Sequence, residues 1–348
     1  MISLFVVILG VFLGVNAERP VYFLSDEYID NLNQQNLPWT AGRNFPSDLT
    51  QYDVERMFGP KPTELPEAPH PSEVRKSYGN ALTAIPVEFD AREYFKSCTS
   101  IISVVNDQGA CASSYAFAIP SVASDRLCIH SHGHIQKNLS SQYILSCCKM
   151  CRYPHQDQIC SGGISSSTWQ WVHKRGLVTG GGYKSNIGCQ PVSFPPCNHG
   201  TTSSSLPSCK TLPAPQPKCH TRCTNDNYGR NFFQDKFRFK KYYWLSEEVS
   251  DIQREIQENG PVIANMYLYD DLLSYKGGVY TVSDNANVVA YITVKIIGWG
   301  VEAGRPYWTI VSTFGESFGN RGTFKILRGR NIAIIESLVN AVLPRGNY

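Results

Sequence analysis

The first quarter of the chain has one short amphipathic stretch, followed by a stretch dense in proline. Residues 24–33 (LSDEYIDNLN) predict a short helix, with Ser25 as its N-cap and acidic residues in its first turn. Residues 59–71 (GPKPTELPEAPHP) contain too many prolines for regular structure, so we expect an extended connector there. The N-terminal part is therefore expected to be a small unit joined to the rest by a linker.

The middle of the chain favours helices. We expect them over residues 113–129, 140–147 and 165–174. Pro120 lies inside the first of these segments, where a proline removes a backbone hydrogen bond at a cost of about 3 kcal/mol. We therefore expect a kink or a shifted start in this helix. Residues 190–218 are rich in proline and serine and predict a surface loop.

The last third alternates β-branched or aromatic runs with glycine-rich turns, a pattern typical of strands. The expected strands are residues 237–245, 278–282, 291–297, 307–313 and 322–327. Residues 250–258 predict a helix with a capping box formed by Ser250 and Gln253. Helices followed by a mostly antiparallel sheet or barrel place the chain in the α+β class.

The composition agrees with a folded globular protein and excludes some partners. The 348 residues are 42% hydrophobic and 18% charged, which suits about two or three domain-sized units. The net charge is only +3, from 32 Lys and Arg against 29 Asp and Glu. Neither nucleic acid nor an anionic membrane is therefore an expected partner.

One long apolar run, residues 2–15, opens the chain. It is shorter than the about 20 residues that span a bilayer. It predicts a secretory signal peptide over residues 1–17, cleaved after Ala17, with a signal anchor as the alternative. No later segment has the character of a membrane span, so we expect a soluble protein that enters the secretory pathway.

The chain has twelve cysteines, an even number, and all lie within residues 98–223. This clustering predicts an oxidising compartment and a disulfide framework, although the pairing cannot be deduced from the spacing. A zinc site at Cys147, Cys148 and Cys151 is the alternative. Adjacent cysteines in a secreted chain favour disulfides over zinc.

Two short motifs suggest surface chemistry. His130, His132 and His134 alternate, and a solvent-exposed loop is a better interpretation than a metal site. The sequence Asn138-Leu139-Ser140 is an N-glycosylation sequon, just before an expected helix. We therefore expect no metal and no cofactor, and a glycan at Asn138.

Residues 108–117 read QGACASSYAF, which resembles the active-site signature QGxCGSCWAF of papain-like cysteine proteases. Further stretches that agree with this family are VEFDAR at 87–92, CSGG at 160–163, GWG at 298–300, PYW at 306–308 and FKILRG at 324–329. Residues 39–45 (WTAGRNF) resemble the propeptide of the cathepsin B-like members. The resemblance covers essentially the whole chain.

The resemblance implies a two-subdomain fold, with a helical disulfide-rich half and a half like an antiparallel β-barrel. It also implies a propeptide over residues 18–84 and a peptidase-homology domain over 85–348, in which residues 189–223 resemble an occluding loop. The disulfides that it implies are Cys98–Cys128, Cys111–Cys160, Cys147–Cys219, Cys148–Cys151, Cys189–Cys223 and Cys197–Cys209.

The family uses a cysteine thiolate at a helix N-terminus, a histidine base and an asparagine that orients this base. A glutamine and the backbone N–H of the nucleophile form the oxyanion hole. The resemblance places Ser114, Ile292 and Ser312 at the first three positions and retains only the glutamine, Gln108. Residues 221–348 contain no histidine at all. The expectation is a protein without a competent catalytic set; an active peptidase that uses Ser114 or an unrecognised base is the alternative.

The substrate cleft is expected to be altered as well. Gly162 and Gly163 match the family segment that binds extended substrate, or they form a plain turn. Tyr291 replaces a glycine on the opposite wall and narrows the groove. Leu338 replaces the glutamate at the base of the specificity pocket, so any remaining pocket is expected to be apolar.

The occluding-loop-like segment keeps one of the two adjacent histidines that grip a substrate carboxylate in cathepsin B-like enzymes. His199 is followed by Gly200, so the grip is halved. His199 is expected to pair with Asp107 and to pin the loop across the cleft, and an unpartnered exposed histidine is the alternative.

These residues together favour a secreted or lysosomal monomer that acts by binding. The expected partners are protease inhibitors, peptides, glycans or extracellular matrix, and a storage or structural protein is a further possibility. Such a protein cannot remove its own propeptide. We expect either cleavage near Ala84 by another protease or retention of residues 18–84.

Overall fold

The computed structural model describes residues 20–63, 75–79, 84–153, 158–200 and 205–346. The expected signal peptide lies outside the described residues, as does most of the proline-rich connector. Within the described residues, no helix is both long and apolar enough to cross a membrane.

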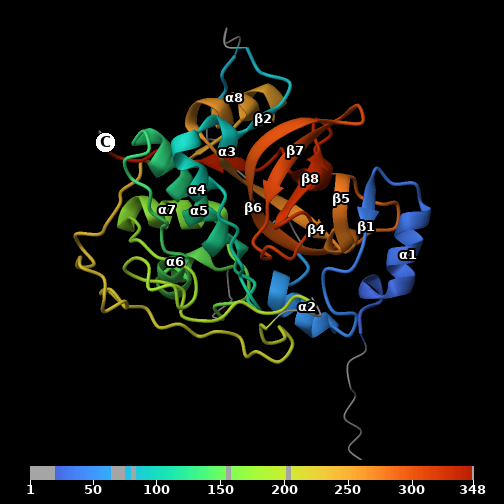
Figure 1. The fold of residues 1–348 in the computed structure, drawn as a ribbon, viewed down its shortest axis with the longest axis horizontal. Coiled ribbons are helices and arrows are strands. Elements are labelled where there is room, and N and C mark those ends of the chain that lie inside the picture. The colour runs from blue at the N-terminus through green and yellow to red at the C-terminus, as the bar shows by residue number, and fades with distance from the viewer. Residues whose placement is uncertain (1–19, 64–74, 80–83, 154–157, 201–204, 347–348) are drawn as a thin grey trace, which may run out of the picture.

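The N-terminal unit contains two helices and one strand, and it packs against the rest of the chain (Figure 1). Its elements are η1 (Tyr22–Leu24), α1 (Asp26–Gln34), β1 (Trp39–Ala41) and α2 (Gln51–Phe58). Helix α1 begins as predicted, because Ser25 Oγ accepts the Tyr28 N–H at 3.1 Å. Helix α2 was not predicted, although Thr50 and Asp53 form a capping box at its start.

The helices of the middle section form one half of the molecule (Figure 1). They are α3 (Ala91–Tyr94), η2 (Lys96–Cys98), α4 (Thr99–Ile102), α5 (Ser114–His130), α6 (Ser141–Cys147), η3 (Lys149–Cys151) and α7 (Ser165–Arg175). Helix α5 starts at Ser114, next to the expected first residue, and continues through Pro120, so the proline does not shift the start of the helix past itself. Nearly all of α5 is buried, and this packing outweighs the cost of the missing hydrogen bond.

The other half is a sheet whose strands are β2 (Phe89–Asp90), β3 (Tyr243–Trp244), β4 (Val262–Tyr269), β5 (Tyr275–Tyr280), β6 (Val288–Glu302), β7 (Arg305–Val311), β8 (Thr323–Leu327) and β9 (Val339–Ala341). Helix α8 (Val249–Asn259) and the short turns η4 (Asp271–Ser274) and η5 (Ile332–Ile334) connect them. The order is β1-β5-β8-β7-β6-β4-β9-β3, with β2 paired to β6. Only the β5–β8 pair among these is parallel.

Three predictions for this half were wrong or incomplete. The run 237–245 forms a regular strand only at β3; Phe237 and Phe239 instead make isolated bridges to Leu177 and Pro344. Strand β4 was not predicted. Helix α8 begins at Val249 without a side-chain cap, so the predicted capping box does not form. The helix starts one residue earlier than expected, which places Ser250 within its first turn.

Two apolar cores hold the molecule together. One fills the helical half and the side of the sheet that faces it. The other lies between the sheet and the N-terminal unit, which contributes Trp39, Phe45, Met57 and Phe58. The N-terminal unit is therefore part of the folded core rather than an appendage.

All twelve cysteines form disulfides, in the six pairs that the family resemblance implies. The zinc alternative does not hold, because Cys147 is bonded to Cys219 and Cys148 to Cys151. The fold is α+β, with a helical disulfide-rich half beside a sheet.

Candidate functional site

Ser114 is the first residue of α5, where the helix meets strand β6. Its side chain is nearly buried, and the residue is 8% exposed. Its Oγ accepts the backbone N–H of Thr293 at 3.1 Å. The positive end of the helix dipole lies at this point and favours negative charge. The hydroxyl is thus used as an acceptor from the facing strand.

The other two replaced positions are Ile292 and Ser312. Ile292 has apolar surroundings, and Ser312 bonds to nearby backbone groups. Ile292 lies on β6 opposite Met266, and it is 1% exposed within the apolar core of the sheet half. Ser312 follows β7; its Oγ donates to the Gly322 carbonyl at 3.0 Å and accepts the Phe314 N–H at 3.3 Å. Among the described residues, Ser312 forms no hydrogen bond with Ser114, and the Ile292 side chain has no group that could form one.

Gln108 is buried and fully engaged. Its Nε2 donates to the Cys111 carbonyl at 3.0 Å and to the Met57 carbonyl, at the end of α2, at 2.7 Å. Thr313 Oγ1 donates to Gln108 Oε1 at 2.5 Å. The amide that would line an oxyanion hole therefore binds a carbonyl of the N-terminal unit. Helix α2 lies below the junction of the two halves in Figure 1.

Gly162 and Gly163 lie where their backbone passes close to the backbone of Ala112 and Cys151. Gly162 has φ +86 and donates its N–H to the Ala112 carbonyl at 2.9 Å. A Cβ at Gly163 would lie 2.4 Å from the Cys151 carbonyl oxygen. Both positions therefore need glycine for the backbone to pass so closely.

Tyr291 and Leu338 are both buried in the core of the helical half. The Tyr291 ring packs edge-on against Tyr267 of β4, with ring centroids 6.0 Å apart. The Leu338 carbonyl accepts the Asn265 N–H at 3.2 Å. Both side chains are thus packed inside this core, and the narrowed groove and the apolar pocket remain predictions.

The loop containing His199 is tied to the same region. His199 is buried, and its Nε2 lies 3.0 Å from Asp107 Oδ1. The Gly109 N–H also donates to Asp107 Oδ1, at 2.7 Å. The His199 ring meets the Phe45 ring of the N-terminal unit edge-on at 5.5 Å. This geometry joins the loop, the Asp107 turn and the N-terminal unit.

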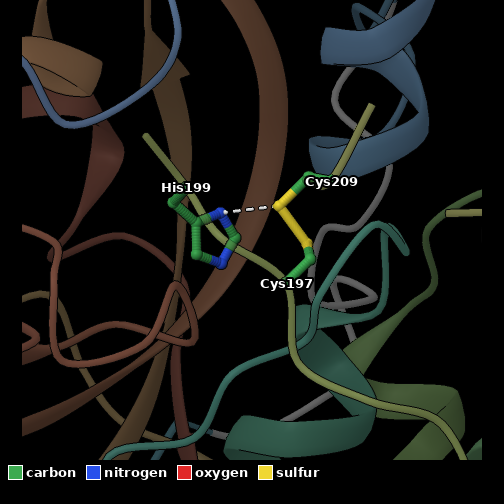
Figure 2. Close-up of side chains that lie close together, drawn as sticks. All are labelled: Cys197, His199 and Cys209. Carbon is green, nitrogen blue, oxygen red and sulfur yellow. Dashed lines mark hydrogen bonds between the residues drawn. A yellow bond between two sulfur atoms is a disulfide. The ribbon is translucent and has the colours of Figure 1, made fainter. Parts of the chain in front are cut away.

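Figure 2 shows the other side of the imidazole, where His199 Nδ1 points at Cys209 Sγ, 3.5 Å away. Cys197, His199 and Cys209 place three potential ligand atoms within 4.8 Å of one another. Both sulfurs are bonded to each other in the Cys197–Cys209 disulfide. Since metals bind thiolates, this cluster is not a metal site in its oxidised form.

The sequence did not predict a buried polar network behind Ser114. Thr293 Oγ1 donates to Asn265 Oδ1 at 3.0 Å, and Asn265 Nδ2 donates to Ser165 Oγ at 2.9 Å. Asn340 Nδ2 donates to the same Ser165 Oγ, and Trp169 Nε1 donates to Asn340 Oδ1 at 2.7 Å. The available signal was one asparagine inside each of two apolar strands, VIANMYLY and VNA.

The remaining motifs lie away from this site. His130 ends α5, and burial lowers the pKa of its imidazole, with Arg126 adding to the effect. Asn138 is half-buried just before α6, and Ser140 of its sequon is buried and caps that helix. His130, His132 and His134 do not form a metal-binding cluster within the described residues.

The fold and these motifs define a papain-type protein with its N-terminal unit in place. Residues 85–343 match the family described as papain family cysteine protease, so the chain belongs to that family.

Among curated relatives, it is similar to two cathepsin B-like proteins of Caenorhabditis elegans. Cathepsin B-like cysteine proteinase 6 is 36% identical over 326 residues, covering 92% of this chain and 84% of that protein. Cathepsin B-like cysteine proteinase 5 is 38% identical over 324 residues, covering 91% of this chain and 89% of that protein.

A solved structure agrees over nearly the whole chain. The procathepsin B S9 of Trypanosoma congolense is 31% identical, with a TM-score of 0.75, and the match covers 94% of this chain and 99% of that chain. The digestive procathepsin L 3 of Tenebrio molitor, at 18% identity and a TM-score of 0.61, shares the fold. The chain is therefore a cathepsin B-like member of the papain family.

Proposed function

We propose that this protein acts by binding and not by peptide hydrolysis. The observation that carries the proposal is the pair of residues at the α5–β6 junction. Ser114 has its hydroxyl bonded to a backbone N–H, and the facing strand offers a buried isoleucine, Ile292, where a base is needed. A serine hydroxyl is a weak nucleophile unless an adjacent base takes its proton.

The positions of the histidines support the proposal. Residues 221–348 contain none. His199 has one ring nitrogen against Asp107 and the other against Cys209. His130 lies at the far end of α5, sixteen residues from Ser114, which is roughly 24 Å along a helix. Loss of such catalytic partners costs factors of about 10⁴–10⁶ in rate.

The proposed organisation is a signal peptide over residues 1–17, a propeptide over 18–84 and a peptidase-homology domain over 85–348. The contact of Gln108 with Met57 supports the view that the propeptide occupies the cleft. With the cleft filled, we expect partners such as protease inhibitors, peptides or matrix components to bind cleft residues weakly until the propeptide leaves. Six disulfides favour an oxidising compartment, so we propose secretion or lysosomal delivery. A glycan at Asn138 would be added on the same route.

The test is hydrolysis of a broad peptide mixture by the purified chain, before and after removal of the propeptide by an added protease. We expect no cleavage by the parent, by Ser114→Ala or by Ser114→Cys, because the base is missing as well as the thiol. The triple variant Ser114→Cys, Ile292→His, Ser312→Asn is the assay control, since it rebuilds the family set.

The adjacent variant Ser113→Ala is the matched control for Ser114→Ala. Cleavage by the parent that survives in Ser113→Ala and disappears in Ser114→Ala would overturn the proposal. It would establish the alternative, an active peptidase with Ser114 as its nucleophile.

A further inference from the structure

Residues 75–79, near the end of the N-terminal segment, are bound on the face formed by β3 and α8. The Lys76 N–H donates to the Trp244 carbonyl at 2.8 Å, and the Lys76 carbonyl accepts the Ser246 N–H at 3.0 Å. These two bonds form a parallel bridge between Lys76 and Leu245. The segment thus pairs through a single bridge with the residue that follows β3, which resembles the strand pairing used in peptide recognition.

Two side chains of this segment converge on one buried carboxylate. Lys76 Nζ lies 2.8 Å from Glu255 Oε2, and Tyr78 OH donates to the same oxygen at 2.7 Å. The Lys76 ammonium also lies over the Tyr243 ring, 5.0 Å from its centroid. The Glu255 side chain is 0% exposed, whereas the Lys76 side chain is 36% exposed, so a partly exposed lysine reaches a buried carboxylate.

The domain itself satisfies the other carboxylate oxygen. Arg126 Nη1 lies 2.9 Å from Glu255 Oε1, and Tyr243 OH donates to Oε1 at 2.6 Å. Among the described residues, the hydrogen bonds to Oε2 come from Lys76 and Tyr78. Without the segment, Glu255 Oε2 would lose both of these charge-assisted partners.

A second carboxylate fixes the backbone of the segment. The Tyr78 N–H donates to Asp251 Oδ1 at 3.0 Å, and Ser246 Oγ donates to Asp251 Oδ2. Asp251 and Glu255 lie one turn apart on α8, so they face the segment together. Asp251 thus binds the backbone of Tyr78, while Glu255 binds the side chains of Lys76 and Tyr78.

We infer that the β3–α8 face is a peptide-binding site, separate from the cleft, whose ligand is the chain's own Lys76-Ser77-Tyr78 segment. This site retains the propeptide on the domain after the chain is cut near Ala84. The inference holds whether or not the protein hydrolyses peptides, because no cleft residue takes part.

The charges around Glu255 predict that the contact survives acid. Burial raises the pKa of this carboxyl, but Arg126 of α5, Lys76 and the Tyr243 hydroxyl outweigh burial and lower it to about 2. His130 of α5 also faces Glu255, and its protonation adds positive charge on that side. Glu258 of α8 interacts with Tyr78, and that repulsion helps to keep Tyr78 protonated. The contact is therefore complete above the ordinary pKa of 4.5 and is lost only as the pH falls through about 2.

The test uses the full chain with specific protease sites inserted at residues 64–74 and 80–83, which frees the bound segment at both ends. A labelled synthetic peptide of residues 72–81 is then added, and its binding is measured by fluorescence anisotropy at pH 7.5 and pH 4.5. We expect exchange into the doubly cut protein at both pH values and no binding to the uncut chain, whose site is filled. Peptides with Lys76→Ala or Tyr78→Phe are expected to bind roughly tenfold more weakly or worse.

A peptide of the same composition in scrambled order, which is not expected to bind, serves as the matched control. Equal binding of the Lys76→Ala peptide and the parent peptide would overturn the inference, as would loss of all binding at pH 4.5. If cutting unfolds the protein, the inference is tested instead by the hydrogen-exchange rates of the backbone amides of residues 75–79 in the uncut chain. Lys76→Ala is expected to speed it, whereas Lys61→Ala, an exposed lysine of the same N-terminal segment, is not.

Discussion

The Ser114 hydroxyl is a structural acceptor as well as the residue in the nucleophile position. Its bond from the Thr293 N–H joins α5 to β6 inside the molecule. Deleting the hydroxyl leaves a buried N–H without this partner, which costs about 1–3 kcal/mol. We expect Ser114→Ala to lower the free energy of unfolding by this amount in urea denaturation.

Thr211→Ala is the control for that measurement, because Thr211 makes an exposed bond to the Ser208 carbonyl. This change is expected to stay within about 0.5 kcal/mol of the parent. Equal effects of the two substitutions would mean that the Ser114 contact has no structural value.

A second residue-scale prediction concerns the buried pair of Asp125 and Lys295. Lys295 Nζ lies 2.9 Å from Asp125 Oδ2. Burial raises the pKa of Asp125 from 3.8 to about 6, against the opposing effect of Lys295. Between these two values the folded chain binds a proton that the unfolded chain does not. This group therefore raises the free energy of unfolding as the pH falls from about 6 to about 4.

We expect Asp125→Asn to remove that gain, as measured by urea unfolding at pH 7, 6, 5 and 4. Asp48→Asn provides the comparison, because Asp48 forms an exposed pair with Lys210. A parallel pH dependence for Asp125→Asn and the parent would contradict the assignment.

At the scale of elements, the loop around His199 is held from two sides. The Cys197–Cys209 disulfide closes it, and the bond from His199 to Asp107 ties it to the turn before α5. We expect His199→Ala to speed hydrogen exchange at the Asn198 and Thr211 amides, because their segment loses its bond to Asp107 and its ring contact with Phe45.

His220→Ala is the control on the same loop, since the described contacts of His220 are made by its backbone carbonyl. Unchanged exchange in His199→Ala would mean that the His199 side chain does not order the loop, which its disulfide and its contacts with Arg56 and Asp48 would then hold.

The sequence predicted elements where local signals agree and missed them where partners far along the chain decide. The helix after Ser25 and the helices that begin near Ser140 and Ser165 follow from caps and composition. The run 237–245 has strand-like residues but finds few strand partners, because β9 pairs with only two of them. Sequence alone gives residue types, whereas pairing is set by the rest of the sheet.

The same division applies to the site. The motif around residues 108–117 located Ser114 and Gln108 without a structure. The bond between Gln108 and Met57 joins residues 51 positions apart, so a local sequence pattern does not predict it. The role of Asn265 likewise depends on its side-chain partners, Thr293 and Ser165, which lie far from it along the chain.

At the scale of the whole molecule, the N-terminal segment is held at several separate places, of which three show its extent. Its aromatic residues enter the core of the sheet half, its α2 helix contacts Gln108, and residues 75–79 bind α8 on another face. Removal of residues 18–84 would consequently take side chains out of the apolar core of the folded protein. A protease that cuts only the linker leaves most of these contacts intact.

Strand β1 pairs along β5 through Trp39 and Gly278, and Gly278 allows this approach because a Cβ there would lie 2.5 Å from the Pro38 carbonyl oxygen. The N-terminal segment thereby supplies the outermost strand of the sheet. A shortened chain that begins at residue 85 would expose the free N–H and C=O groups of β5 to solvent. An exposed edge of this kind can form strand pairs with a neighbouring molecule, so the shortened chain would tend to self-associate and precipitate during production.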